Sequence, residues 1–247
     1  MAIIQNPQER LARTTEKRQA LLRFLRDELY TTPAVTGLVM QCGERAARQT
    51  ISSMEKAGLV KRHTVQVLPD LPPFTVIGIT THGQAMAFFP AKGEAVIDRT
   101  FEPHRFSLLN VQHTLDIQRL RLQSVNSGLV KSWIPSDRLL ASTKGLKKPD
   151  AALMTTAGVR VAVEVERTIK SPKRYVAVLA GHLQMIQQGK WQKVIWACPN
   201  QDIADRVQAL VKSITRVKVA GMDTKIDPAK HHAGLVFTTY ESFTDHL

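Results

Sequence analysis

Three acidic side chains carry the most specific chemical signal in the sequence. Asp150 precedes an apolar run over 151–154, and beyond a turn at 155–158 Glu164 and Glu166 alternate with valines. This alternation has the period of a strand with one buried face. A glycine-bearing turn between two such runs predicts a β-hairpin.

The apolar residues predict one register for this hairpin. If Thr155 pairs with Val159, the pairs that follow are Leu153–Val161, Ala151–Val163 and Asp150–Glu164. Both apolar faces then match, as a well-defined register requires. Glu166 lies two residues beyond Glu164 on the same face, so we expect the three carboxylates to converge.

Converging carboxylates need a positive partner. Opposed side chains in a hairpin lie roughly 4.5–5.5 Å apart at Cβ, where like charges destabilise the pairing. A hard divalent cation, Mg²⁺ or Mn²⁺, prefers oxygen ligands and would offset the repulsion. We therefore predict Asp150, Glu164 and Glu166 as metal ligands. The alternative is a solvated strand face whose carboxylates pair with nearby lysines.

The charge of the chain suggests what such a site acts on. The 247 residues include 34 Lys and Arg against 21 Asp and Glu, a net charge of +13. This favours an extended polyanion, and nucleic acid is the expected partner. The two cysteines, Cys42 and Cys198, are far apart, which suits a reducing cytoplasm. With no signal-like or membrane-spanning apolar run, we expect a cytoplasmic protein and no membrane insertion.

Residues 1–89 are predicted to form a winged helix-turn-helix DNA-binding domain. After an irregular segment over 1–15, helical periodicity predicts helices near 16–30, 32–40 and 44–56, and strands near 59–67 and 74–80. The third helix would enter a major groove. The residues expected to contact DNA from it and from the wing are Arg45, Arg48, Gln49, Ser52, Lys61 and Arg62. The alternative is a winged helix used for protein contacts.

A linker over 90–106 and a second domain over 107–247 are expected to follow. The predicted elements are a helix at 107–123, an edge strand at 128–134, the hairpin, a helix at 171–188, a strand at 193–198, a helix at 202–214 and an edge strand at 235–239. This order predicts an α/β domain with a mixed sheet flanked by helices. Residues 215–233 show no regular pattern and are predicted to be irregular.

Cations flank the acidic hairpin in the sequence. Lys147 and Lys148 end the loop before Asp150, and Lys173 and Arg174 lie in the first turn of the helix that follows Glu166. Cations are unfavourable at a helix N-terminus, so their presence there suggests an anionic partner. We predict that these four residues contact DNA; for the loop, simple solvation is the alternative.

The acidic residues also carry a family resemblance. Asp150, thirteen intervening residues and then Glu164-x-Glu166 resemble the PD-(D/E)xK nuclease pattern, in a variant with glutamate in place of lysine. The longer succession PDA, VEVERT, KRY and VIWACPN resembles the replication-relaxation protein family, which includes the MOBC-type plasmid relaxases. The resemblance covers most of residues 20–215, with specific motifs at 113–120, 149–168 and 194–199.

The resemblance implies a restriction-endonuclease-like core and an Mg²⁺- or Mn²⁺-dependent endonuclease that nicks one strand at a plasmid origin of transfer. It implies proton transfer or a phosphate contact for His113 and an outer metal contact for Asp116. Glu166 takes the position where such nucleases usually keep lysine, where it would orient or deprotonate water, or bind a metal. Lys170, or its rival Lys148, would replace the missing lysine. The implied partners are double-stranded and locally single-stranded origin DNA, an accessory relaxosome protein and a coupling protein.

Other functions remain open at this point. Many relaxases form a covalent tyrosyl-DNA link beside a histidine cluster. The adjacent pair His231-His232 would point to opposite faces of a strand, which favours a nuclease-type site. Tyr175 is placed near the cleft by the KRY match, whereas its apolar helix stripe predicts packing. The alternatives to a relaxase are a replication initiator or regulator with an inactive nuclease fold, and a chromosomal-type restriction nuclease.

Overall fold

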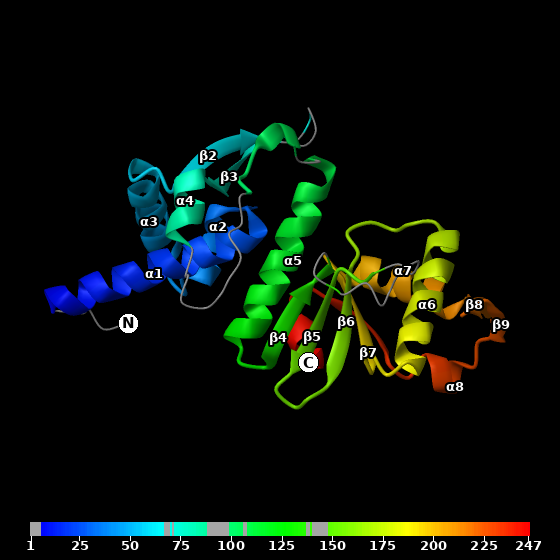
Figure 1. Cartoon of the computed structure of the whole chain (residues 1–247). Coiled ribbons are helices and arrows are strands. Elements are labelled where there is room, and N and C mark those ends of the chain that lie inside the picture. Colours follow the sequence, from blue (N-terminus) through cyan, green and yellow to red (C-terminus); the bar gives the residue numbers. More distant parts are fainter. Residues whose placement is uncertain are drawn as a thin grey trace. The chain divides into compact units, whose positions relative to one another are not determined.

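The computed structural model describes residues 6–66, 70, 72–87, 99–105, 108–136, 139 and 148–247 (Figure 1). The chain divides into two compact units, 1–119 and 120–247. Both helices and sheets are present, which confirms the α/β class. The division falls within helix α5, Leu108–Asn126. Most of the predicted linker at 90–106 lies outside the described residues.

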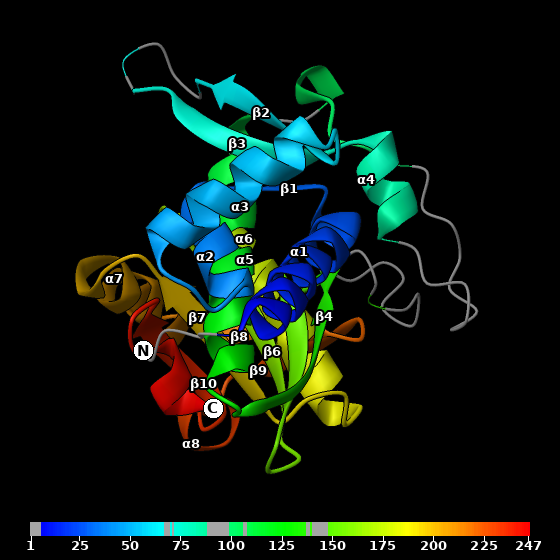
Figure 2. The same ribbon diagram turned by 90° about the vertical axis from the view of Figure 1, so that its left-hand side faces the viewer.

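The described part of the first unit contains four complete helices, the first part of a fifth and a small sheet. Its elements are α1 (Pro7–Glu28), β1 (Tyr30–Thr31), α2 (Pro33–Val39), α3 (Glu44–Lys56), β2 (Val60–Val65), β3 (Phe74–Ile79), α4 (Thr81–Met86), the 3-10 turn Pro103–Arg105 and the start of α5. The strands pair antiparallel in the order β1-β3-β2, beside α1, α2 and α3 (Figure 2).

The core of the first unit explains the orientation of α3. Leu21, Leu22 and Leu25 of α1 are buried, and Ala47, Ile51 and Met54 of α3 are buried. With three of its residues directed into the core, α3 turns its polar side outward.

Helix α1 begins much earlier than its apolar periodicity predicts. The predicted irregular segment over 1–15 is wrong from Pro7 onward. Asn6 caps the helix, because its Oδ1 accepts a hydrogen bond of 2.9 Å from the backbone N–H of Gln8. Proline is also favourable in a first helical turn. Polar residues can therefore extend a helix whose C-terminal half is anchored by packing.

The second unit is built on a five-stranded mixed sheet. Its elements are the end of α5, β4 (Val130–Pro135), β5 (Ala151–Thr155), β6 (Arg160–Val165), α6 (Pro172–Gln187), β7 (Lys193–Cys198), α7 (Gln201–Lys212), β8 (Arg216–Val219), β9 (Met222–Lys225), α8 (Pro228–His231), β10 (Leu235–Thr239) and the 3-10 turn Phe243–His246. The strand order is β10-β7-β6-β5-β4. Strands β4, β5 and β6 run antiparallel, and β6, β7 and β10 run parallel.

The predicted register of the β5–β6 hairpin is confirmed. Ala151 pairs with Val163 and Leu153 with Val161. The backbone N–H of Thr155 donates to the carbonyl of Val159 at 2.9 Å. Gly158 has φ 84°, which explains why the turn requires glycine.

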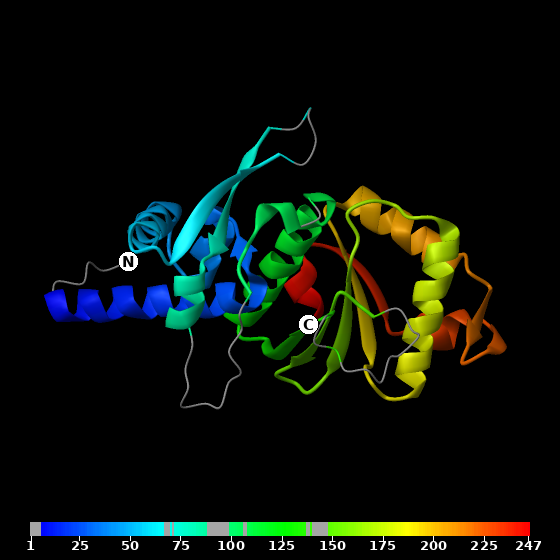
Figure 3. The same cartoon turned by 45° about the horizontal axis from the view of Figure 1, so that its top comes forward.

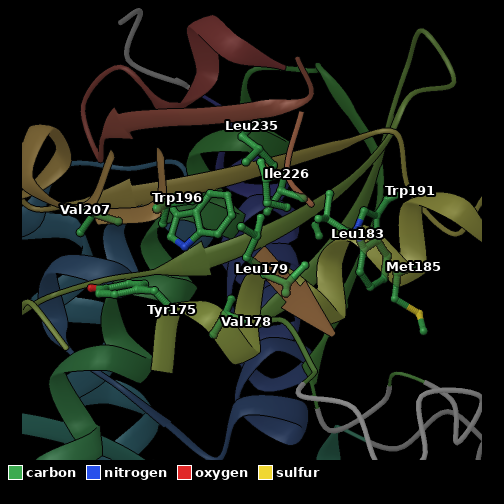
Figure 4. Packing of buried hydrophobic residues seen from close by; sticks show 14 of the residues in the cluster. Tyr175, Val178, Leu179, Leu183, Met185, Trp191, Trp196, Val207, Ile226 and Leu235 are labelled. Atoms are coloured by element: carbon green, nitrogen blue, oxygen red, sulfur yellow. The ribbon is translucent and has the colours of Figure 1, made fainter. Parts of the chain in front are cut away.

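Strand β6 is buried on both faces, not on one as its alternation suggests. Every residue from Val161 to Glu166 is buried, so the alternative of a solvated strand face is wrong. On one face, α6 and α7 contribute to a cluster around Trp196 of β7, where Tyr175, Leu179 and Val207 pack (Figure 4). On the other, Trp133 of β4 packs against Phe243, with ring centroids 6.5 Å apart.

The predicted irregular segment 215–233 is also wrong. It forms the β8–β9 hairpin and the short helix α8. The hairpin turns at Ala220 and Gly221, whose φ values of 50° and 83° suit a tight two-residue turn. His231 and His232 lie at the end of α8, not in a strand. Among the described residues, no helix combines the length and apolar character needed to cross a bilayer.

Candidate functional site

Asp150 directly precedes β5 and lies beside the end of β6. Its backbone N–H donates to the carbonyl of Val163 at 3.0 Å, and its Oδ2 accepts from the backbone N–H of Val165 at 2.8 Å. Val165 is the residue between Glu164 and Glu166. The hairpin therefore brings the three acidic residues to one end of β6. There the Asp150 carboxylate, and not a backbone carbonyl, accepts the hydrogen bond of the Val165 N–H.

Glu164 points into the interior on the side of α6. Its side chain is 1% exposed, and its Oε1 lies 2.9 Å from Nε2 of His182, which is 2% exposed. The imidazole meets Trp191 and Trp196 edge-on, at centroid distances of 5.7 and 5.4 Å. Its Nδ1 has no hydrogen-bond partner among the described residues.

Sequence reasoning missed His182. The available signal was helix spacing, since His182 lies three residues after the inward-facing Leu179 and therefore on the same helix face. Nothing in the chain order connects it to Glu164, because the contact spans 18 positions and depends on how α6 packs against the sheet.

Glu166 is bound by the lysine that follows it. The Nζ of Lys170 lies 2.7 Å from Oε1 of Glu166, which is 1% exposed at its side chain. The pairing of a carboxylate with a nearby lysine is thus present, but in a buried position. The Nζ of the rival Lys148 instead donates to the carbonyl of Leu139 at 2.8 Å. Of the two lysines, Lys170 is the one in contact with an acidic residue of the site.

Tyr175 is packed in the core. It is 1% exposed, and its hydroxyl accepts a hydrogen bond of 3.2 Å from the backbone N–H of Lys170. Burial raises the pKa of this tyrosine, to which the nearby negative charge of Glu166 also contributes. A buried phenol with a raised pKa is a poor nucleophile, so the geometry disfavours a covalent tyrosyl-DNA link at Tyr175.

Each glutamate thus has a cationic or imidazole partner of its own. In the part of the chain that the structure describes, no group of three or more His, Cys, Asp or Glu side chains is arranged to hold a metal ion. Metal binding by Asp150, Glu164 and Glu166 stays a prediction. His113 is half-buried and Asp116 buried on α5 within the first unit, and their predicted roles also stay predictions.

Cys198 ends β7 close to Glu166. Burial, and secondarily the negative charge of Glu166, raises the pKa of its thiol from 9.0 to about 12. The folded state therefore favours the neutral thiol. The contribution of this thiol to the free energy of unfolding is fully present below pH 9.0 and is lost as the pH rises to about 12.

We expect urea unfolding of the wild type to show this loss. From pH 9 upward its free energy of unfolding should fall about 1.4 kcal/mol per pH unit more steeply than that of Cys198→Ala. Cys42→Ala is the matched control, because Cys42 is only partly buried. Parallel pH profiles for the wild type and Cys198→Ala would contradict the raised pKa.

A second candidate surface is the outer side of α3. Arg45, Arg48 and Gln49 are exposed and Ser52 is half-buried, as the predicted DNA-binding face requires. Together with Glu44, Ser53 and Lys56 they line one open hollow. Arg48 forms a 2.5 Å ion pair with Glu44, but both side chains are mostly exposed, so the arginine remains available to a ligand.

Arg62 lies at the base of the wing, as predicted, but its side chain contacts α3, and its DNA contact stays a prediction. Its guanidinium forms an ion pair with Glu55 of α3 and donates to Oγ of Ser52 at 2.8 Å. Its backbone N–H also donates to Oε1 of Glu55 at 3.2 Å. Arg62 is therefore primarily a bridge between β2 and α3, whereas its neighbour Lys61 is exposed.

Two further residues predicted to contact DNA follow the acidic hairpin in the sequence. Lys173 and Arg174 are exposed in the first turn of α6, three and four residues after Lys170. Lys147 lies outside the described residues.

Comparison of the chain with models of protein families, with curated proteins and with solved structures gives no match.

Proposed function

We propose that the chain is a DNA-binding protein whose second unit nicks one strand of the bound DNA in a metal-dependent reaction, as a plasmid mobilisation relaxase does. The observation that carries the proposal is the hydrogen bond from the Val165 N–H to the Asp150 carboxylate. It holds Asp150 beside the Glu164-x-Glu166 segment, as the resemblance to PD-(D/E)xK nucleases requires.

The order of elements supports a restriction-endonuclease-like core. Helix α5 is followed by the antiparallel strands β4, β5 and β6, then by α6 and by β7, which is parallel to β6. The acidic residues lie at the start of β5 and the end of β6, and α6 begins directly after them. This order of helix, strands, helix and strand is the one that the resemblance implies.

The first unit supports binding of double-stranded DNA. Three helices lead into an antiparallel pair of strands, and the third helix presents two arginines and a glutamine to solvent. In a winged helix-turn-helix the equivalent helix enters the major groove, where such side chains contact bases and phosphates. Lys61 at the start of the wing would add a phosphate contact.

The donor set of the acidic residues fits a hard cation. Asp150, Glu164 and Glu166 supply carboxylate oxygens, the ligands that Mg²⁺ and Mn²⁺ prefer, and would hold the ion. When bound, such a cation polarises a phosphoryl oxygen and makes water a better nucleophile. Lys170 fixes the orientation of Glu166 through its 2.7 Å ion pair. Lys173 and Arg174, exposed nearby, would position the DNA backbone.

One observation favours a second candidate, a DNA-binding initiator or regulator with an inactive nuclease fold. Glu164 and Glu166 are both buried and already paired, with His182 and Lys170. Metal binding has to compete with these contacts. In a regulator the same pairs would simply stabilise the interior.

A nicking assay separates the two candidates. The purified chain is incubated with supercoiled DNA of the plasmid that carries its gene, in Mg²⁺, in Mn²⁺ and in EDTA. A relaxase converts the DNA to the open circle only when metal is present. Binding without nicking would favour the regulator, and cleavage of both strands at many sites a restriction nuclease. Accessory and coupling proteins are proposed partners of the relaxase only.

The DNA-binding surface has its own test. Arg45→Ala and Arg48→Ala should each weaken binding to origin DNA about tenfold or more, because each removes a contact to a base or phosphate. A lost phosphate contact also lowers the salt dependence of log K by about one unit. Fluorescence anisotropy at several salt concentrations measures both effects.

The control for these variants removes the same charge elsewhere. Arg206 of α7 is an exposed arginine in an i,i+4 ion pair, as is Arg48. Arg206→Ala should bind DNA with wild-type affinity and salt dependence. Equal losses in Arg206→Ala and the α3 variants would show that only net charge matters, and the proposed role of α3 would fail.

A further inference from the structure

The N-terminal half of α1 is exposed on every side. All residues from Pro7 to Glu16 are exposed, although the helix is continuous from Pro7 to Glu28. Figures 1 and 3 show this half extending past the other helices of the first unit. An isolated helical segment this short is only marginally stable in water, so a partner that packs along it would stabilise it.

One side of this segment borders a hollow in the first unit. The residues that α1 contributes are Glu9, Ala12, Arg13, Glu16, Lys17 and Ala20. Their spacing of three and four places them along one helix face. The end of α2, with Val39 and the buried Met40, forms the opposite wall. The hollow therefore has a helical wall with small and charged residues and a partly apolar wall.

The charge pattern of this helix face is complementary to that of the same face on a second, antiparallel copy of the helix. The six positions are symmetric about the midpoint between residues 14 and 15. In an antiparallel pair of such faces, Arg13 of each helix meets Glu16 of the other, which gives two ion pairs across a two-fold axis. Lys17 then lies within about one turn of Glu9 of the other helix, and the two alanines allow a close approach.

We propose that this face binds a second copy of the chain, with the two α1 helices antiparallel across a two-fold axis. A two-fold interface must be self-complementary, and the charge pattern meets that requirement. Each helix would occupy the hollow of the other copy, against the end of α2. The overlap from residue 9 to residue 20 is about 18 Å long at the rise of an α-helix.

Sedimentation of the full chain without DNA tests the proposal. The wild type should sediment as a dimer. Arg13→Glu and Glu16→Arg should each weaken dimerisation about tenfold or more, because each brings like charges together twice. The combined variant Arg13→Glu/Glu16→Arg restores both pairs with reversed sign and should again be a dimer.

Arg10→Glu is the matched control. Arg10 is exposed on the same helix but does not line the hollow, so the same charge reversal there should leave the mass unchanged. Circular dichroism checks that each variant keeps its helix content. A wild type that is monomeric up to roughly 100 µM would overturn the proposal, as would a combined variant no more dimeric than the singles. The experiment contains no DNA, so its outcome is separate from that of the nicking assay.

Discussion

Asp150→Asn should abolish strand nicking and leave the fold intact. Asparagine has nearly the shape of aspartate and keeps an oxygen that can accept the hydrogen bond from the Val165 N–H, which is 2.8 Å long in the wild type. It loses the negative charge that a divalent cation requires. Because a bound cation supplies several kcal/mol of transition-state stabilisation, we expect nicking to fall by about 100-fold or more.

Two measurements accompany this variant. Its urea unfolding midpoint should be close to that of the wild type, which separates lost chemistry from lost structure. Affinity for origin DNA should also be retained, because the proposed recognition surface lies on α3. Asp205→Asn, at an exposed position of α7, is the control and should nick normally. Normal nicking by Asp150→Asn would remove Asp150 from the site.

His182→Leu should strongly destabilise the second unit. It removes the imidazole that lies 2.9 Å from the Glu164 carboxylate, whose side chain is 1% exposed. Breaking a buried pair by removing one member costs about 3–5 kcal/mol. Urea unfolding followed by tryptophan fluorescence measures the loss, since Trp191 and Trp196 both contact the imidazole.

The double variant Glu164→Leu/His182→Leu sharpens this prediction. The double variant no longer contains the buried carboxylate that His182→Leu deprives of its imidazole. It should therefore be more stable than His182→Leu alone. The exposed ion pair Arg216–Asp223 supplies the contrast, and Asp223→Ala should hardly change the unfolding midpoint. If the loss in the free energy of unfolding of the double variant equals the sum of the losses in Glu164→Leu and His182→Leu, the two side chains do not depend on each other.

Local patterns in the sequence predicted the strands of the five-stranded sheet and the hairpin register correctly. The register follows from a two-residue period on both strands and from the glycine that the turn requires, and both are local properties. The boundaries of α6 are similarly predictable, because Ser171, Pro172 and Gly189 mark its ends. These are positions where neighbouring residues alone determine the conformation.

Contacts between distant segments were not predictable in this way. Burial of β6 on both faces depends on the packing of α6 on one face of the sheet and of Phe243 on the other. The partner of Glu164 comes from that same helix. Arg62 is a surface cation by sequence, and only the packing of β2 against α3 reveals its bond to Glu55. Spacing rules identify which residues share a face, but not what covers that face.

The bridge made by Arg62 has a consequence for ligand binding. Since Glu55 and Ser52 contact its guanidinium in the free protein, the base of β2 is already linked to α3 before a ligand binds. A mobile wing would lose conformational entropy when the complex forms. Here part of that entropy has already been lost during folding. A ligand that touches both segments gains affinity from this, without any additional contact.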